Sequence, residues 1–308
     1  EVRESDIPGA AGESMVMRLL DPSVASFQFD NLGLNTTLYK IMQAELARPN
    51  GLIVTTGPTG SGKTTALYAL LREAHTSERK IITIENPVEY KIDGIVQTQV
   101  GDDYTFANGL RAILRQDPDI IMVGEIRDQE TIEIAVKAAL TGHMVLSTIH
   151  TNSAVSTITR LLDMKVQPFK ITSTLRYIEA QRLCRRLCKH CKEPFQPPEA
   201  VVKEVREVLD PCKDRELDHS VLESGQFTLY RAKGCEACNG GYKGRLGVYE
   251  VMRMDREIEK MVLDGEREAD IQDRCIEKGM ITLLQDGFIK ALQGHTTLEE
   301  VYKVSSGH

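Results

Sequence analysis

The chain has 308 residues, of which 41% are hydrophobic and 27% are charged, and its formal net charge is −7. This is the composition of an ordinary globular protein with room for about two domains, and it excludes a collagen-like, disordered or disulfide-rich class. The negative charge argues against a surface that wraps nucleic acid, and no apolar run approaches the roughly 20 residues of a transmembrane segment.

The first thirty residues do not have the pattern of a complete domain. The chain starts at Glu1 without a Met or a secretory signal, so we expect a fragment whose natural start lies upstream. Residues 1–7 and 13–20 are predicted to be strands on either side of a Pro8-Gly9 turn. Two strands alone are marginally stable in water, so we expect the tail of a truncated sheet. Residues 31–35 look like a linker into the main domain.

The next predicted elements are a helix over 38–48, an apolar strand over 51–56, and a glycine-rich loop followed by a helix over 65–73. The loop fits the phosphate-loop pattern G-x-x-x-x-G-K-[ST], and strand, loop and helix occur in the order that aims backbone N–H groups at a phosphate. Lys63 is expected to reach the β- and γ-phosphates, and the Thr64 hydroxyl to hold Mg2+. The residues expected to bind nucleotide here are Gly57, Pro58, Thr59, Gly60, Ser61, Gly62, Lys63, Thr64 and Thr65.

Strands and helices then alternate, which predicts an α/β fold with a mostly parallel sheet covered by helices. Strands are expected over 80–85, 95–100, 119–125 and 143–150, and helices over 108–116 and 129–140. Several of these strands end in polar side chains. Because ligands bind outside the carboxyl ends of strands in open α/β sheets, the pattern predicts one active edge.

At that edge, Glu125 follows an apolar strand and is expected to hold Mg2+, directly or through water. Glu85 and Glu89 flank a short turn, and either can orient the water that attacks the γ-phosphate; their spacing does not choose between them. His150 ends the next strand, where a γ-phosphate sensor and an ordinary structural histidine are both consistent with the sequence.

Seven cysteines beside a nucleotide loop favour metal ligation over disulfides. Two C-x-x-C pairs, Cys188 with Cys191 and Cys235 with Cys238, predict a closed structural Zn2+ site of four thiolates. Beside the first pair, a basic cluster from Arg182 to Lys192 is read as a solvated helix face, with a nucleic-acid contact as the alternative. Residues 199–222 are expected to be a partly helical insertion, and short helices broken at glycines are expected after residue 252.

These residues together resemble the secretion-ATPase superfamily, in particular the type II secretion and type IV pilus extension ATPases. The resemblance covers nearly the whole chain and depends on motifs in order. These are GPTGSGKTT (57–65), TIENPVEY (83–90), LRQDPDIIMVGEIRD (114–128), TGHMVLSTIHT (141–151), the two C-x-x-C pairs, and GRLGVYEV (244–251).

The resemblance implies a RecA-like ATPase core over 31–183, preceded by the end of another domain at 1–30. A tetracysteine module over 184–240 and a C-terminal helical region over 241–308 complete the expected chain. By resemblance Glu89 is the catalytic base, with Lys63 and Glu125 as the other catalytic residues. His143 and His150 match a histidine box, and Arg3 and Arg18 match arginines that reach the nucleotide. Glu85, His150, Arg3 and Arg18 therefore join the expected nucleotide-binding set.

The family also implies a function: Mg2+-dependent ATP hydrolysis by a homo-hexamer that drives pilin or pseudopilin assembly. The expected partners are an inner-membrane platform and accessory proteins, which place a cytoplasmic motor at that membrane. The four cysteines favour an assembly motor over a retraction motor. Asn86 stands where the family usually has Asp, so the acidic box lacks one charge. The alternatives are a nucleic-acid-translocating ATPase and a nucleotide-gated scaffold without turnover.

Overall fold

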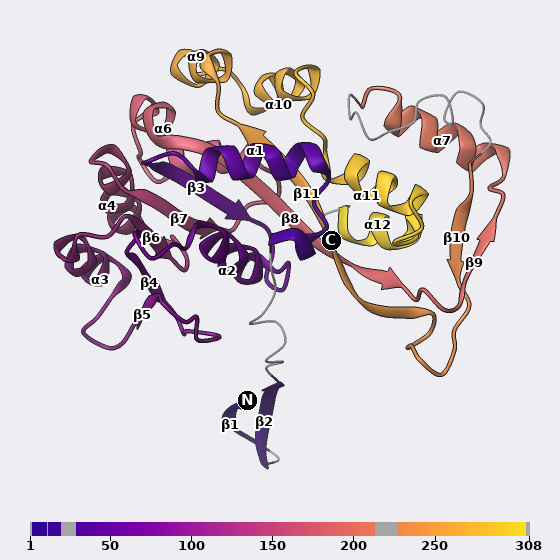
Figure 1. The fold of residues 1–308 in the computed structure, drawn as a ribbon, viewed down its shortest axis with the longest axis horizontal. Helices are drawn as coiled ribbons and strands as arrows, with labels where there is room; N and C mark the ends of the chain where they lie inside the picture. Colours follow the sequence, from indigo (N-terminus) through magenta and orange to yellow (C-terminus); the bar gives the residue numbers. More distant parts are fainter. Residues whose placement is uncertain (1, 11, 20–28, 213–226, 306–308) are drawn as a thin grey trace.

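A computed structural model describes residues 2–10, 12–19, 29–212 and 227–305 (Figure 1). The two predicted N-terminal strands are present as β1 (Val2–Gly9) and β2 (Gly12–Leu19), which pair with each other in an antiparallel sheet of their own. The linker that follows, at residues 33–35, leads directly into α1 (Thr36–Leu46), where the Asn35 side chain accepts a hydrogen bond from the Leu38 N–H at 2.8 Å and caps the helix.

The main domain is built on a seven-stranded sheet in the order β11-β8-β3-β7-β6-β4-β5. All neighbouring strands are parallel except β11 and β8, so the prediction of a mostly parallel sheet is confirmed. The central strands are continuous apolar runs because both of their faces are covered. Their bounds are β3 (Gly51–Thr56), β4 (Ile81–Glu85), β5 (Val96–Gln99), β6 (Ile120–Val123), β7 (Met144–Ile149), β8 (Leu175–Leu187) and β11 (Tyr242–Arg253).

Helices cover both faces of this sheet, and alternate residues of each strand enter two separate cores. On β3, for example, Ile53 faces one core while Leu52 and Val54 face the other. The smaller core is covered by α1 and α2 (Lys63–Ala74). The larger one is covered by α3 (Phe106–Ile113), α4 (Gln129–Leu140), α5 (Ser156–Asp163), α6 (Pro168–Thr174), α9 (Arg256–Asp264) and α10 (Glu268–Glu277).

The sheet extends beyond the strands that the sequence predicted. No strand was expected over β8 or β11, yet these two strands pair along most of their length and complete one side of the sheet (Figure 1). The basic residues from Arg182 to Arg186 therefore lie on a strand, and the expectation of a solvated helix face there is wrong. The sheet also draws on residues from both sides of the expected boundaries at 183/184 and 240/241.

A third, smaller core lies beside the far end of β8 and β11. It is formed by α7 (Glu199–Leu209), α11 (Leu283–Leu292), α12 (Leu298–Ser305) and the two-stranded sheet of β9 (Lys192–Phe195) and β10 (Leu229–Ala232). The predicted helix breaks after residue 252 are confirmed: Gly265 ends α9 with φ of 73°, and Gly279 and Gly294 follow α10 and α11. Part of the expected insertion, residues 213–222, lies outside the described residues.

Candidate functional site

The glycine loop lies where the sequence placed it, between β3 and α2. Gly57 and Gly62 have φ values of 147° and 89°, which side chains rarely adopt. A Cβ on Gly57 would lie 2.5 Å from the backbone oxygen of Gln181 on β8, so the loop lies directly against that strand. The loop leads straight into the N-terminus of α2, which presents unpaired N–H groups at this edge of the sheet.

Lys63 opens α2 and turns back over its own loop. Its ammonium donates to the backbone oxygens of Gly57 at 2.8 Å and Pro58 at 2.9 Å. Burial lowers the pKa of Lys63 to about 8, and the nearby Arg182 guanidinium adds to this effect, while Glu125 opposes it. A phosphate that competes for this ammonium must draw it away from the two carbonyl groups.

The predicted active edge is a single cavity of about 480 Å³. Four adjacent parallel strands, β3, β7, β6 and β4, bring their carboxyl ends to it. Residues from each of the four edge motifs line this cavity, namely Thr59, Gly60, Gly62, Lys63, Thr64, Thr65, Glu85, Asn86, Glu89, Glu125 and His150. The structure therefore brings together side chains that lie up to about ninety positions apart in the sequence.

Glu85 and Glu89, which the sequence left as alternatives, have different surroundings. Glu85 is 2% exposed and its carboxylate accepts hydrogen bonds from Tyr68, from Thr83 at 2.6 Å and from Gln97 at 3.1 Å. Glu89 is half-buried at the cavity wall, and its backbone N–H donates to the Tyr68 hydroxyl at 3.3 Å. Both glutamates line the cavity, but Glu85 is nearly fully buried and its carboxylate accepts three hydrogen bonds from donors of the protein, whereas Glu89 is only half-buried.

Glu125 and His150 lie close together in the same cavity. Glu125 Oε2 accepts from Arg127 Nε at 2.6 Å and lies 3.8 Å from His150 Nε2. Burial and the charge of Lys63 lower the pKa of His150, against the opposing effect of Glu125. His150 is therefore neutral near pH 7 and is able to donate or accept a hydrogen bond there.

Two buried ionisable side chains hold the loop that follows His150 in place. Arg182 on β8 donates Nη2 to the Asn152 carbonyl at 2.8 Å, and Glu250 on β11 accepts from the Ala154 N–H at 2.8 Å. Arg182 and Glu250 are 6% and 3% exposed. The two strands that the sequence did not predict thus support the active edge.

A second cavity of about 540 Å³ lies on the other side of Gly62 and Thr65. Its wall is apolar at Leu34, Leu183 and Leu246 and basic at Arg186 and His295. Arg245 lines both cavities and lies in the GRLGVYEV motif, to which the sequence analysis assigned no site residue. Its nearness to the loop became visible only once β11 was placed beside β8.

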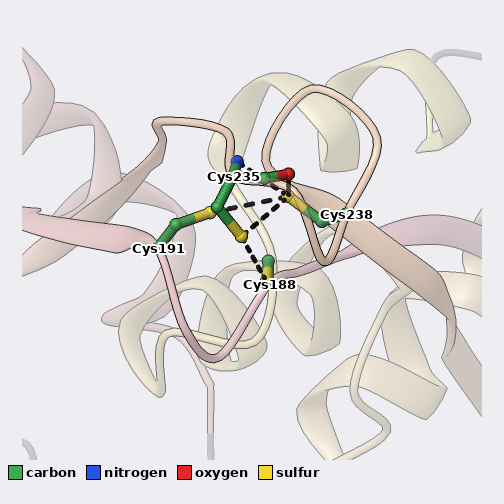
Figure 2. A group of neighbouring side chains, drawn as sticks. All are labelled: Cys188, Cys191, Cys235 and Cys238. Atoms are coloured by element: carbon green, nitrogen blue, oxygen red, sulfur yellow. Dashed lines mark hydrogen bonds between the residues drawn. The ribbon is translucent and has the colours of Figure 1, made fainter.

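The four predicted zinc ligands converge from two loops (Figure 2). Cys188 and Cys191 lie between β8 and β9, and Cys235 and Cys238 lie between β10 and β11. All four sulfurs lie within 4.8 Å of one another, with separations of 3.9 Å (Cys188–Cys235), 3.6 Å (Cys191–Cys238) and 3.5 Å (Cys235–Cys238). Four sulfurs at about 2.3 Å from one ion in a tetrahedron stand roughly 3.8 Å apart, so this donor set fits Zn2+.

The remaining predicted residues give less information. Arg3 and Arg18 are register partners across β1 and β2, and their side chains lie outside the described part of the structure.

Among the described residues, no helix is long and apolar enough to cross a lipid bilayer. The basic cluster is dispersed, since Arg182 is buried, Arg185 pairs with Glu300 at 2.7 Å, and Lys192 donates to the Gly294 carbonyl at 2.7 Å.

Comparisons with known proteins agree with the resemblance. The family model described as "Type II/IV secretion system protein" matches residues 1–303. The type II secretion system ATPase E of Vibrio cholerae is 46% identical over 308 residues, which are 99% of this chain and 58% of that protein. The type IV pilus assembly ATPase PilB of Pseudomonas aeruginosa is 44% identical over 309 residues, 99% of this chain and 52% of that protein. The chain thus spans little more than half the length of these relatives.

Solved structures give the same result for the fold. The pilus retraction motor PilT with bound ADP has a TM-score of 0.68 and 27% identity, and the match covers 98% of this chain and 77% of that chain. The DotB ATPase of Legionella pneumophila has the same TM-score at 23% identity, covering 98% of this chain and 71% of the other. The predicted fold class is confirmed.

Proposed function

The chain belongs to the type II/IV secretion system protein family, and on this basis we propose that it binds and hydrolyses ATP with Mg2+. The observation that carries the proposal is the cavity at the carboxyl edge of β3, β7, β6 and β4. It gathers Lys63, Thr64, Glu89, Glu125 and His150 around the N-terminus of α2. This is the set of cation, metal ligand, carboxylate and helix end that phosphoryl transfer to water uses.

Each of these residues has a role in the proposed reaction. Lys63 leaves the Gly57 and Pro58 carbonyls and binds the β- and γ-phosphates. Thr64 and Glu125 would hold Mg2+, which neutralises charge on the phosphates when bound. Glu89 orients the attacking water and receives its proton, since Glu85 is already engaged by three donors of the protein. His150 senses the γ-phosphate from beside Glu125.

The second cavity is proposed to hold the nucleoside. It adjoins Thr65, the last residue of the loop motif, and its leucines and basic side chains offer apolar and cationic contacts to a base and a ribose. Arg3 and Arg18 are proposed to reach the nucleotide as the family resemblance implies.

The tetracysteine cluster is proposed to hold a structural Zn2+ ion. Its four sulfurs fill a tetrahedral shell, so no position is left for a substrate. The ion would join the β8–β9 and β10–β11 loops, and its contribution would be to folding and not to catalysis.

For the whole protein we propose a homo-hexameric, cytoplasmic motor that drives pilin or pseudopilin assembly through partners at the inner membrane. The names of the two relatives, a type II secretion ATPase and a pilus assembly ATPase, support this. The rival reading is a motor on nucleic acid. It loses support because Arg182 is buried and Arg185 and Lys192 are each bound to acceptors of the protein, so these three residues do not form one basic face.

Steady-state phosphate release measured over a range of protein concentrations, with and without single- and double-stranded DNA, tests the proposal. Turnover that needs Mg2+, rises per subunit with protein concentration and ignores DNA supports an assembling secretion motor. Strong stimulation by DNA would instead favour the nucleic-acid motor, and absence of hydrolysis would leave the nucleotide-gated scaffold.

A further inference from the structure

A tyrosine that no motif of the sequence analysis included links the phosphate loop to the proposed catalytic base. Tyr68 lies on α2, one turn after Thr64 and so on the same face of the helix. It is 3% exposed and its hydroxyl is at the wall of the phosphate cavity. That hydroxyl donates to Glu85 Oε2 and accepts from the backbone N–H of Glu89 at 3.3 Å.

Glu85 determines which way the Tyr68 hydroxyl donates its hydrogen bond. Its other oxygen, Oε1, accepts from Thr83 at 2.6 Å and from Gln97 at 3.1 Å, so the carboxylate is held on β4 and towards β5. Glu85 can accept but not donate a hydrogen bond when it is ionised. The phenolic proton of Tyr68 therefore points at Glu85, and the hydroxyl lone pairs face the Glu89 backbone. The buried phenol accordingly keeps its proton, and its pKa lies well above the ordinary value because of burial and the Glu85 charge.

The turn that carries Glu89 is held from two sides. From β5, Gln99 accepts from the Val88 N–H at 3.2 Å and Gln97 donates to the Tyr90 carbonyl at 3.0 Å. From α2, the Tyr68 hydroxyl binds Glu89 itself. The contact from α2 connects the turn to the helix bearing Lys63 and Thr64.

We propose that Tyr68 is a positioning residue that sets the distance between the Glu89 carboxylate and the phosphates bound at Thr64. The inference depends on the proposed ATPase function and names a residue of that same site. Tyr68 does not touch the nucleotide; it acts through the Glu89 backbone. Misplacing a catalytic group by about 1 Å can lower a rate by two orders of magnitude, so one hydroxyl is enough to matter.

The test is Tyr68→Phe, which removes only the hydroxyl. The expected result is a fall in kcat of about 10- to 100-fold with the Kd for ATP unchanged within about threefold, because Lys63 and the loop are untouched. Tyr104→Phe is the matched control: the same change on a half-buried tyrosine outside the cavity is expected to leave kcat unchanged. Unchanged kcat in Tyr68→Phe, or a loss of ATP affinity that accounts for the slower rate, would overturn the inference.

A double variant separates positioning from general loss of structure. In a Glu89→Gln background, adding Tyr68→Phe is expected to cost no further activity, since the group that Tyr68 positions is already gone. If the losses of activity from the two single variants multiply in the double variant, Tyr68 does not act through Glu89. If Tyr68→Phe does not fold, Glu85→Ala tests the same link from its other end and is expected to lower kcat with ATP binding retained. Wild-type protein without ATPase activity would overturn the proposed function itself, whereas a fully active Tyr68→Phe variant overturns this inference alone.

Discussion

The phosphate site and the tetracysteine cluster are built in opposite ways. The four sulfurs lie within 4.8 Å of one another, and three of their separations, 3.5, 3.6 and 3.9 Å, match a tetrahedral zinc shell. In the proposed phosphate site the main cation, Lys63, is bound to the carbonyls of its own loop and would have to leave them to bind phosphate. A closed site that is complete in advance suits a structural ion, and an open site that exchanges its contacts suits a substrate that comes and goes.

Glu89→Gln is the change with the largest expected effect on the open site. The amide keeps the size of the side chain but cannot take a proton, so hydrolysis should fall by about 10³-fold. ATP should still bind, because the loop and Lys63 are unchanged. Phosphate release and ATP binding measured on the same preparation check this, and normal turnover would move the base elsewhere.

Removal of metal is the matching test of the closed site. A strong chelator is expected to lower the free energy of unfolding by several kcal/mol, because the loops that Cys188 and Cys235 belong to lose their common ion. Elemental analysis should find one zinc per chain, and thermal melting should show the loss. A Cys235→Ser variant should begin at the lower melting temperature and not respond to the chelator; wild-type melting that ignores the chelator would show that the thiols hold no metal.

A smaller effect is expected from the ion pair between Arg185 on β8 and Glu300 on α12. Arg185 donates to both oxygens of Glu300, and this contact, ahead of those from Lys303, lowers the pKa of Glu300 to about 2. Arg185→Gln should lower the free energy of unfolding only modestly, since solvent at the half-exposed guanidinium screens the pair.

The pH dependence of that contribution follows from the direction of the shift. Because the pKa of Glu300 is depressed by folding, the stabilisation is present above about pH 4.5 and is lost as pH falls towards 2. Denaturant melts of wild type and Arg185→Gln should therefore converge at low pH. Arg231→Gln, which removes an exposed pair with Glu193, serves as the control and should lower the free energy of unfolding less than Arg185→Gln does.

The smallest expected effect is the change of ATP affinity with pH that follows from the protonation of Lys63. Because its pKa is about 8 in the free site, raising the pH from 7 to 8.5 removes the charge from most molecules, and bound phosphates restore it. ATP affinity should weaken about fourfold over this range, with proton uptake on binding at pH 8.5. Calorimetry in buffers of different ionisation enthalpy measures that uptake, and pH-independent binding would show that Lys63 stays charged.

The sequence was sufficient for those parts of the fold that local pattern encodes. The loop from Gly57 to Thr64 and the strands around it carry apolar runs and glycines that report directly on their conformation. The spacing of the C-x-x-C pairs likewise predicted that the four cysteines come together, as they do. The convergence of Glu89, Glu125 and His150 on one cavity followed from the rule that parallel strands present their carboxyl ends at one edge.

The parts that were missed are those where tertiary contacts override local pattern. β8 contains Arg182, Arg185 and Arg186, which look solvated, yet Arg182 is buried because backbone carbonyls and Glu250 surround it. Tyr68 was not singled out from the sequence, since its proposed role depends on a strand end that follows about twenty residues later. Signals of this kind appear only when the neighbouring strands are known.

Phosphate release by wild-type protein and by Lys63→Ala, at saturating Mg2+ and ATP and with matched melting temperatures, decides whether ATP is hydrolysed in this cavity. Turnover is expected in the wild type, with a loss of at least about 10³-fold in the variant, because the cation that stabilises the transferring phosphoryl group is gone. Undiminished hydrolysis by Lys63→Ala would show that this cavity is not where ATP is cleaved.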